Sequence, residues 1–420
     1  MGGNMATLAL LARGQPSRSP GRALPLAIPL LVLLVLSACQ VQPSRRIGLP
    51  SEQPVRFPFH LLPDLHMLPP GASVARMFSL SSVPTALAFA PDGRMFIAEK
   101  GGFGGNQEAH VWTFDGASLQ RWLTLTVSTE GERGLVGLAL DPHFERNGFV
   151  YLVYTSARPQ PEWRLVRYRD ESGRGVDPTV LMRVAFDPSC PFHFSGHVEF
   201  GPDGRLYVTI GDLCLGNPAQ YLEHPAGKMH RLNPDGTIPR DNPFYDGDGP
   251  NLDSVFALGF RNTFAFTFDP FSGQILGAEN GPQCNDELNR IRAGGNYGWP
   301  WDFNHQTCEY ADLPQFEKPL YVWKTPIAPA GIAVYSGPMF PEWNGAVLVC
   351  AWNTGQLHLF MLDGVRQRMT GVFVYSIPGA FCRIGPWVAP DGAVWFADAD
   401  GLYRLYRPWR NLSILLPLPR

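Results

Sequence analysis

The sequence predicts an all-β protein, a six-bladed β-propeller over residues 65–408. One phrase, a Pro-Asp-Gly-like turn followed by a β-rich run, occurs six times between positions 90 and 400, and helical periodicity is almost absent. Copies spaced by roughly 50 to 70 residues, each with room for several strands, are typical of propeller blades, whose radial arrangement protects the sheet edges. Two stacked β-sandwiches are the alternative, but they do not account for one repeated phrase.

The turn that opens each copy has a physical basis. Proline fixes φ, aspartate caps the turn with its side chain, and glycine takes the positive-φ position before the strand. The runs that follow are rich in Val, Ile, Tyr and Phe, as strands are. The clean copies start at Pro91, Pro202 and Pro390, and the looser ones start at Asp141, Asp269 and Pro338.

Residues 1–38 predict a lipoprotein signal peptide. Three arginines precede an apolar run over residues 24–36, which leads into Leu-Ser-Ala-Cys39. A basic flank, a short apolar stretch and small residues at a cleavage site are typical of an export signal. The run has about 13 residues, fewer than the ~20 that a membrane-spanning helix needs. Its ending resembles a bacterial lipobox, which predicts lipidation of Cys39; an ordinary signal peptide and an uncleaved anchor are the alternatives.

The segments on either side of the predicted propeller and the net charge of the chain indicate which partners to expect. Residues 39–64, with several Pro, Ser and Gln, predict a flexible lipid-anchored tether, and residues 409–420 a C-terminal tail. The chain has 34 Lys and Arg against 37 Asp and Glu, a formal net charge of −3. A mildly acidic chain without a basic run binds polyphosphate poorly, so we expect no nucleic-acid partner. We expect membrane contact through the N-terminal lipid only.

Six cysteines remain beyond the signal region. An even number in an exported chain indicates disulfides, and the absence of a Cys-x-x-Cys pair argues against structural zinc. Six cysteines allow fifteen connectivities, and we predict that neighbours pair in sequence order. The predicted pairs are Cys190–Cys214, Cys284–Cys308 and Cys350–Cys382.

Three stretches, at 131–151, 193–212 and 227–300, contain motifs that are more specific than the repeat of a propeller blade. They contain Gly-Glu-Arg-Gly-Leu-Val-Gly, Gly-Phe-Arg-Asn, Glu-Asn-Gly-Pro and Gly-Gly-Asn-Tyr-Gly-Trp-Pro. With these motifs the chain resembles the soluble quinoprotein glucose/sorbosone dehydrogenases, the PQQ-dependent aldose sugar dehydrogenase type, over about residues 65–405. The resemblance implies a six-bladed propeller whose top face holds pyrroloquinoline quinone (PQQ) on a calcium ion. A sugar hydroxyl would be oxidised there to a lactone.

The resemblance assigns the catalytic roles to three residues. His193 matches the family's general base, and imidazole suits that role because it titrates near working pH. Asp212 ends a predicted strand and would orient the imidazole, although it can equally be a turn cap. Arg261 would polarise the quinone carbonyl that receives the hydride; the alternative is a buried arginine that binds backbone carbonyls.

The resemblance also implies the residues that hold the cofactor. Glu132 and Asn262 match positions that line the quinone pocket, and Tyr297 either lines it or packs in the core. Gly281 and Pro282 match the residues whose backbone carbonyls hold the calcium. Carbonyl oxygen is a hard ligand that suits calcium.

The family pattern breaks where cations are expected. Asn353 stands at the position of a lysine, and Cys382 and Ile384 stand at those of an Arg-x-Arg pair. Arg383 lies between them, so in a strand its side chain points to the other face. Each charge-assisted bond lost to a cofactor with three carboxylates costs about 1.5–3 kcal/mol. Lys324, where an aromatic residue is expected, is a candidate for one of the missing charges.

These observations predict an exported dehydrogenase, lipid-anchored at the bacterial cell envelope. It would oxidise an aldose or a related hydroxylated compound to its lactone and pass electrons to an external acceptor. The missing cations favour an alternative, a non-enzymatic propeller lipoprotein that binds a glycan or protein on its top face. The hedgehog-interacting proteins, a sister branch of the family that the chain resembles, imply that the scaffold can serve binding alone. A propeller hydrolase such as a calcium lactonase is a third possibility, but it needs carboxylates on several blades.

Overall fold

The computed structural model describes residues 64–66, 68–311, 313–399 and 401–408, all within the compact unit Glu52–Arg420. The predicted signal peptide, the Cys39 lipidation site, nearly all of the tether and the C-terminal tail lie outside the described residues. Within the described part, no helix is long and apolar enough to cross a membrane. The described chain is nearly all β-strand. Its helical segments are α1 (Phe144–Asn147), η1 (Asn217–Gln220) and η2 (Pro341–Trp343).

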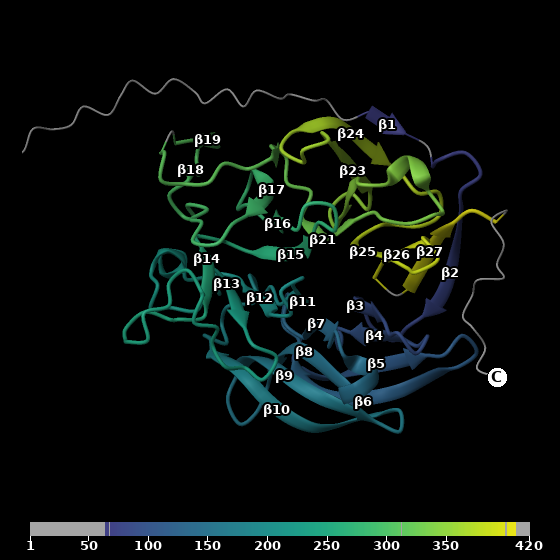
Figure 1. Ribbon diagram of the computed structural model, residues 1–420, viewed down its shortest axis with the longest axis horizontal. Helices are drawn as coiled ribbons and strands as arrows, with labels where there is room; N and C mark the ends of the chain where they lie inside the picture. Colours follow the sequence, from purple (N-terminus) through teal and green to yellow (C-terminus); the bar gives the residue numbers. More distant parts are fainter. Residues whose placement is uncertain (1–63, 67, 312, 400, 409–420) are drawn as a thin grey trace, which may run out of the picture. The chain divides into compact units, whose positions relative to one another are not determined.

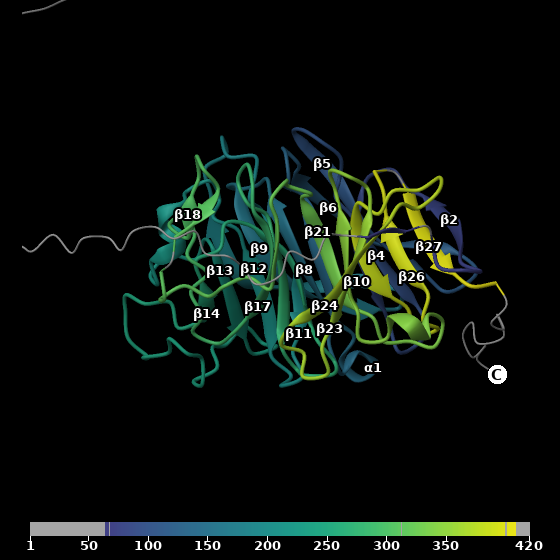
Figure 2. The same ribbon diagram turned by 90° about the horizontal axis from the view of Figure 1, so that it is seen from above.

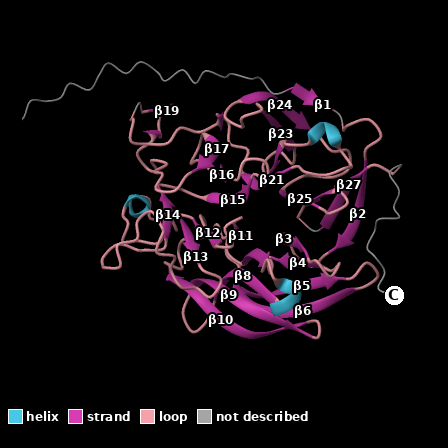
Figure 3. Ribbon diagram, in the orientation of Figure 1, coloured by secondary structure: helices cyan, strands magenta, loops and turns pink. Residues whose placement is uncertain are grey.

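The strands form sheets that follow one another around a common centre (Figures 1 and 3). The first sheet contains β3 (Pro84–Phe89), β4 (Met95–Glu99), β5 (Asn106–Phe114), β6 (Leu119–Ser128), β7 (Leu135–Leu140), β8 (Phe149–Ser156), β9 (Glu162–Glu171) and β10 (Arg174–Ala185). The second contains β11 (Val198–Phe200), β12 (Leu206–Ile210), β13 (Lys228–Leu232) and β14 (Val255–Leu258). The third contains β15 (Thr263–Phe268), β16 (Ile275–Glu279), β17 (Asp286–Ile291) and β20 (Tyr321–Trp323). A hairpin of β18 (Phe303–Asn304) and β19 (Glu309–Tyr310) lies between β17 and β20 in sequence.

The last two sheets join the two ends of the described chain. One contains β21 (Pro329–Val334), β22 (Val347–Ala351), β23 (Leu357–Leu362) and β24 (Met369–Tyr375), with β1 (Asp64–His66) parallel to β24. The other contains β25 (Ile384–Val388), β26 (Val394–Ala397), β27 (Gly401–Tyr406) and β2 (Ser73–Ser79). The antiparallel pairing of β2 with β27 brings the first part of the chain onto the last sheet. The all-β prediction is confirmed, and the count of six blades stays a prediction.

The Pro-Asp-Gly turns form as the sequence predicts. Gly93, Gly204 and Gly392 have φ of 90°, 71° and 84°, the left-handed region that favours glycine. The aspartate before each of them accepts a hydrogen bond from the N–H two residues further on. The strands that follow, β4, β12 and β26, are buried along their whole length. Local turn chemistry therefore fixes where each of these strands begins.

Two core histidines each contribute a loss of stability in acid. Burial lowers the pKa of His230 and of His358 from 6.5 to about 4. His230 is neutral in the fold, with Nε2 donating to the Pro225 carbonyl at 3.0 Å and Nδ1 lying 2.9 Å from the Ser254 hydroxyl. Between pH 6.5 and 4 the unfolded chain takes up protons that the folded chain does not, so the free energy of unfolding falls by about 3 kcal/mol per histidine.

The measurement is denaturant unfolding of the wild type and His358→Gln at pH 7, 5.5 and 4.5. The variant removes one of the two groups, so its free energy of unfolding should rise relative to that of the wild type as the pH falls from 6.5 to 4.5. Equal slopes for the two proteins would contradict the assignment of His358 as a neutral core group.

Candidate active site

The predicted site residues lie in connections between strands. His193 lies between β10 and β11, and Asp212 lies two residues after the end of β12. Arg261 and Asn262 join β14 to β15, and Gly281 belongs to the connection from β16 to β17. The side view shows such connections gathered at the two ends of the strands (Figure 2). Hydrogen bonds tie the first three connections together, since the Asp212 N–H donates to the Arg261 carbonyl at 2.7 Å and Asn262 Oδ1 accepts from the Ser195 N–H at 3.3 Å.

His193 and Asp212 form a close pair. His193 Nδ1 lies 2.5 Å from Asp212 Oδ1, and the Asp212 side chain is only 2% exposed. The carboxylate oxygen can only accept when ionised, so Nδ1 carries the proton and Nε2 keeps the lone pair that a general base needs. The His193 side chain is 15% exposed, which leaves it open to a small ligand. The pair therefore has the arrangement of a base and its orienting carboxylate.

The backbone around His193 is held in an unusual conformation. His193 has φ of +64°, rare for a non-glycine residue. Its N–H and that of Phe194 donate to Glu132 Oε2 at 2.7 and 3.1 Å. Phe194 is fully buried in the core, and a Cβ on Gly211 would lie 2.2 Å from the His193 carbonyl oxygen. Glycine is thus required at 211, and Glu132 acts as an anchor for the histidine loop.

The three predicted disulfides form, each between two cysteines that follow one another in the order of the cysteines along the chain. Cys190–Cys214 links the loop that carries His193 to the residues just after Asp212. Cys284–Cys308 links the connection after β16 to the short hairpin β18–β19. Cys350–Cys382 links β22 to the segment before β25. Two of the bridges therefore restrain connections that carry candidate site residues.

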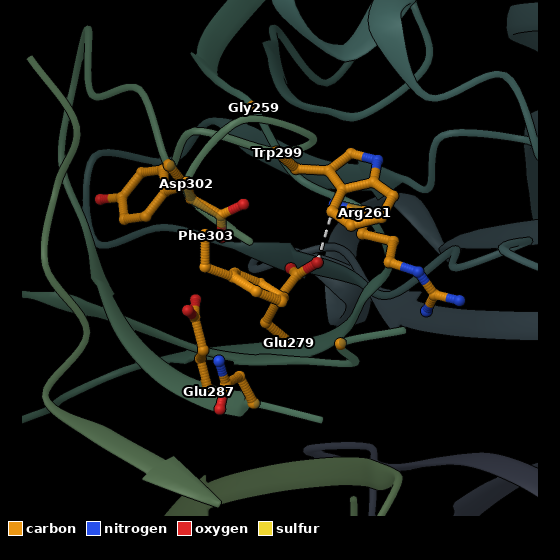
Figure 4. Close-up of a pocket in the computed structure, with 10 residues that line it drawn as sticks. Gly259, Arg261, Glu279, Glu287, Trp299, Asp302 and Phe303 are labelled. Atoms are coloured by element: carbon orange, nitrogen blue, oxygen red, sulfur yellow. Dashed lines mark hydrogen bonds between the residues drawn. The ribbon is translucent and has the colours of Figure 1, made fainter. Parts of the chain in front are cut away.

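Arg261 lies over an aromatic ring in the interior of the site. Its guanidinium carbon is 5.4 Å from the ring centre of Trp299, and Nη1 donates to the Asn280 carbonyl at 3.0 Å. Its backbone N–H donates to Glu279 Oε1 at 2.8 Å, the contact dashed in Figure 4. Burial lowers the pKa of Arg261, and the nearby carboxylate of Asp212 opposes that effect. The guanidinium remains charged and keeps donors for an anionic or carbonyl ligand.

Asn262 connects the histidine loop to the arginine loop. Its Nδ2 donates to Glu132 Oε2 at 3.1 Å, the same oxygen that binds the His193 N–H. Its own N–H donates to Glu279 Oε1 at 2.7 Å. Glu279, to which the sequence analysis gave no role, therefore fixes both backbone N–H groups of the Arg261–Asn262 pair. Its place in the Glu-Asn-Gly-Pro motif was the available signal.

Buried carboxylates line a small pocket beside Arg261 (Figure 4). Burial raises the pKa of Glu279 to about 8 and that of Glu287 to about 7. Burial also raises the pKa of Asp302, whose Oδ1 is buried without a hydrogen-bond partner among the described residues. Hydroxyl groups of Thr263 and Tyr310 donate to Glu279 and Glu287, respectively. The carboxyl groups on this side of Arg261 therefore lie in a poorly solvated region in which their neutral form is favoured.

The turn after β16 has the tightness expected of the predicted calcium seat. A Cβ on Gly281 would lie 2.2 Å from the Cys284 carbonyl oxygen, so only glycine fits. Asp286 holds the turn by accepting from the N–H groups of Gly281, Ile327 and Ala328 at 2.9, 2.7 and 2.8 Å. Burial raises the pKa of Asp286 to about 6. Within the described ranges, no cluster of three or more His, Cys, Asp or Glu could hold a metal ion, so calcium here would depend on carbonyl oxygens.

The positions where cations are expected supply none to the site. Cys382 is fully buried in a disulfide, and Ile384 is buried. Arg383 pairs with Asp398 at 2.8 Å and donates to the Trp352 carbonyl at 2.9 Å. Asn353 Nδ2 donates to the Pro326 carbonyl at 3.1 Å.

Two further predicted residues lie near the calcium turn and the acidic pocket. Lys324 is exposed, and its carbonyl accepts from the Asn285 N–H at 3.4 Å, which places its backbone beside the Gly281 turn. Tyr297 lines the pocket next to Arg261, stacks on Phe260 at 4.6 Å and donates its hydroxyl to the Arg290 carbonyl at 2.5 Å. The Tyr297 hydroxyl is therefore engaged in a hydrogen bond within the protein, and only the aromatic ring is available to contact a ligand in the pocket.

A nearly all-β chain with a histidine–aspartate pair and a partly buried arginine in its connections fits the class of propeller-like oxidoreductases. The model of the glucose/sorbosone dehydrogenase family matches residues 81–407, and the chain belongs to that family. It is similar to aldose sugar dehydrogenase YliI of Escherichia coli, with 28% identity over 69% of this chain and 80% of that protein. Quinoprotein glucose dehydrogenase B of Acinetobacter calcoaceticus is 31% identical over 52% of this chain and 50% of its own length. The crystal structure of the E. coli soluble aldose sugar dehydrogenase in the apo-form superposes with a TM-score of 0.70 at 25% identity, covering 80% of this chain and 99% of that one.

Proposed function

We propose that the protein is an exported, PQQ- and calcium-dependent dehydrogenase that oxidises an aldose or a related hydroxylated compound to its lactone. The observation that carries this proposal is the 2.5 Å contact between His193 and a buried Asp212, in a loop bonded to that of Arg261. Family membership supports the same chemistry.

The chain's own residues can perform the proton chemistry. His193 Nε2 accepts the proton of the hydroxyl on the anomeric carbon, and Asp212 stabilises the imidazolium that forms. Arg261 places positive charge where negative charge develops on the acceptor. The quinone, when bound, supplies the acceptor for the hydride that leaves the same carbon. The product of losing this proton and hydride from a cyclic aldose is the lactone.

The donor set fits the cofactor in part. Arg261, Asn262 and Glu132 would line the quinone, with the Tyr297 ring next to Arg261, and the carbonyl oxygens of Gly281 and Pro282 would hold calcium. The tight glycine turn at 281 and the positive charge of Arg261 support this assignment. Lys324, exposed beside that turn, is the candidate for a compensating charge.

The architecture and the location of the protein are part of the proposal. Six blades result if the first sheet divides between β6 and β7, and the single residue pair between β6 and β8, Val127 with Ser156, supports that division. The chain would be exported and held at the cell envelope by a lipid on Cys39. Electrons would pass to an external acceptor.

Steady-state dye reduction over a panel of aldoses tests the proposal. We expect turnover with PQQ and calcium together, and loss of turnover when calcium is chelated before PQQ is added. The absence of turnover with every aldose at saturating PQQ and calcium would contradict it. The lack of cations at Asn353, Cys382 and Ile384 would then favour the second candidate, a propeller that binds a glycan or protein without catalysis.

A further inference from the structure

We propose that Trp299 is a positioning residue that couples the carboxylate of the base pair to Arg261. The inference rests on the proposed function only for its effect on turnover. Trp299 is the tryptophan of the Gly-Trp-Pro motif, and neither the motif nor the resemblance assigns it a role. It would act through Asp212 and Arg261 and would not itself touch the reacting atoms.

The indole of Trp299 contacts both sides of the site. Its Nε1–H donates to Asp212 Oδ2 at 2.8 Å, while the other oxygen of that carboxylate meets His193 at 2.5 Å. The guanidinium of Arg261 lies 5.4 Å from the ring centre, and the two side chains lie together in Figure 4. The ring of His305 stacks on the indole at 4.8 Å and 11°. One side chain thus contacts Asp212 and Arg261 at once.

The backbone of Trp299 is fixed to the loop that carries Arg261. Its N–H donates to the Gly259 carbonyl at 2.9 Å, and its carbonyl accepts from Gln220 Nε2 at 2.7 Å. A Cβ on Gly259 would lie 2.3 Å from Asn296 Oδ1, so the two segments approach as closely as glycine permits. Because the backbone is held on both sides, the indole N–H is aimed at Asp212 before any ligand binds.

Among the described residues, Trp299 supplies one of four donors to the Asp212 carboxylate. The others are His193 Nδ1 and the backbone N–H groups of Cys214 and Gly216. The charged groups that face the pair are Glu132, bonded to the His193 N–H, and Arg261, whose carbonyl accepts from the Asp212 N–H. The indole N–H partly neutralises the carboxylate of Asp212. Without this donor, the carboxylate interacts more strongly with the protonated His193. The imidazolium is then held more tightly and releases its proton less readily.

Trp299→Phe tests this, because phenylalanine keeps an aromatic ring beside Arg261 and His305 and removes only the donor. Trp301→Phe is the matched control, an exposed tryptophan two residues further on. An NMR titration of the His193 imidazole in the protein without cofactor should show its midpoint at higher pH in Trp299→Phe than in the wild type, by about half a unit or more. Loss of the signal in His193→Gln assigns it.

With PQQ, calcium and an active aldose, we expect kcat of Trp299→Phe to fall roughly tenfold with KM within about twofold, and the acid limb of the rate profile to move to higher pH. Trp301→Phe should match the wild type in every measurement. If Trp299→Phe has a lower melting temperature but the midpoint of the His193 titration does not move, the inference is overturned, and Trp299 has only a packing role. The NMR result holds whether or not the wild type turns over, so failure of the proposed function is seen separately.

Discussion

Replacing His193 with alanine is expected to lower turnover by a factor of about 10²–10⁴ while the protein stays folded. In the proposed mechanism the imidazole accepts the substrate proton, and Asp212, 2.5 Å away, does not replace it because its other contacts hold it in place. The two backbone N–H donors to Glu132 and the buried Phe194 do not depend on the imidazole, so the loop should persist. Dye reduction and thermal melting measure the two effects.

His197→Ala is the matched control for this variant. His197 lies four residues further on, 3.4 Å from Glu199, with its ring packed against Phe266. Its removal should leave turnover within about twofold of the wild type. If His193→Ala keeps wild-type turnover, or if both variants lose it equally, His193 is not the base.

Removing the Cys190–Cys214 bridge is expected to reduce both stability and turnover. The bridge closes a sequence separation of 24 residues that contains His193 and Asp212. A loop of that length is worth roughly 3 kcal/mol in the unfolded-chain entropy model. The double variant Cys190→Ala/Cys214→Ala should therefore unfold at lower denaturant, and its turnover should fall at least about tenfold because the spacing of the base pair is no longer fixed.

The Cys350–Cys382 bridge provides the comparison. Its sequence separation of 32 residues predicts a similar stability loss, and neither cysteine lies next to His193 or Asp212. Cys350→Ala/Cys382→Ala should thus lose stability to a similar extent and lose less turnover. Equal losses of turnover at equal losses of stability would mean that the Cys190–Cys214 bridge has no specific effect on the site.

Features set by neighbouring residues could be predicted from the sequence. The turn at Pro91, the strand that follows it and the all-β class depend on local preferences, which the sequence shows directly. Strand alternation was the basis for placing Arg383 away from the site, but Arg383 lies just before β25, and its pairing with Asp398 is a contact that alternation does not predict. The resemblance brought together His193, Asp212 and Arg261, which the structure places in connected loops.

Contacts between distant segments could not be predicted. Trp299 and Asp212 are 87 residues apart, and Asn262 and Glu132 are 130 apart. No local pattern distinguishes a tryptophan that packs in a core from one that donates to a catalytic carboxylate. These contacts depend on how neighbouring sheets twist and pack, which sets the positions of their connections.

The central claim is that this chain binds PQQ and calcium although cations are missing at Asn353, Cys382 and Ile384. The most direct measurement is an equilibrium titration of the purified full-length chain with PQQ plus calcium, followed by the absorbance of the cofactor, with an aldose added at the end. We predict saturable binding at micromolar or lower concentration and reduction of the bound quinone by the sugar. The absence of binding at micromolar cofactor would contradict the claim and would direct attention to ligands of the propeller face.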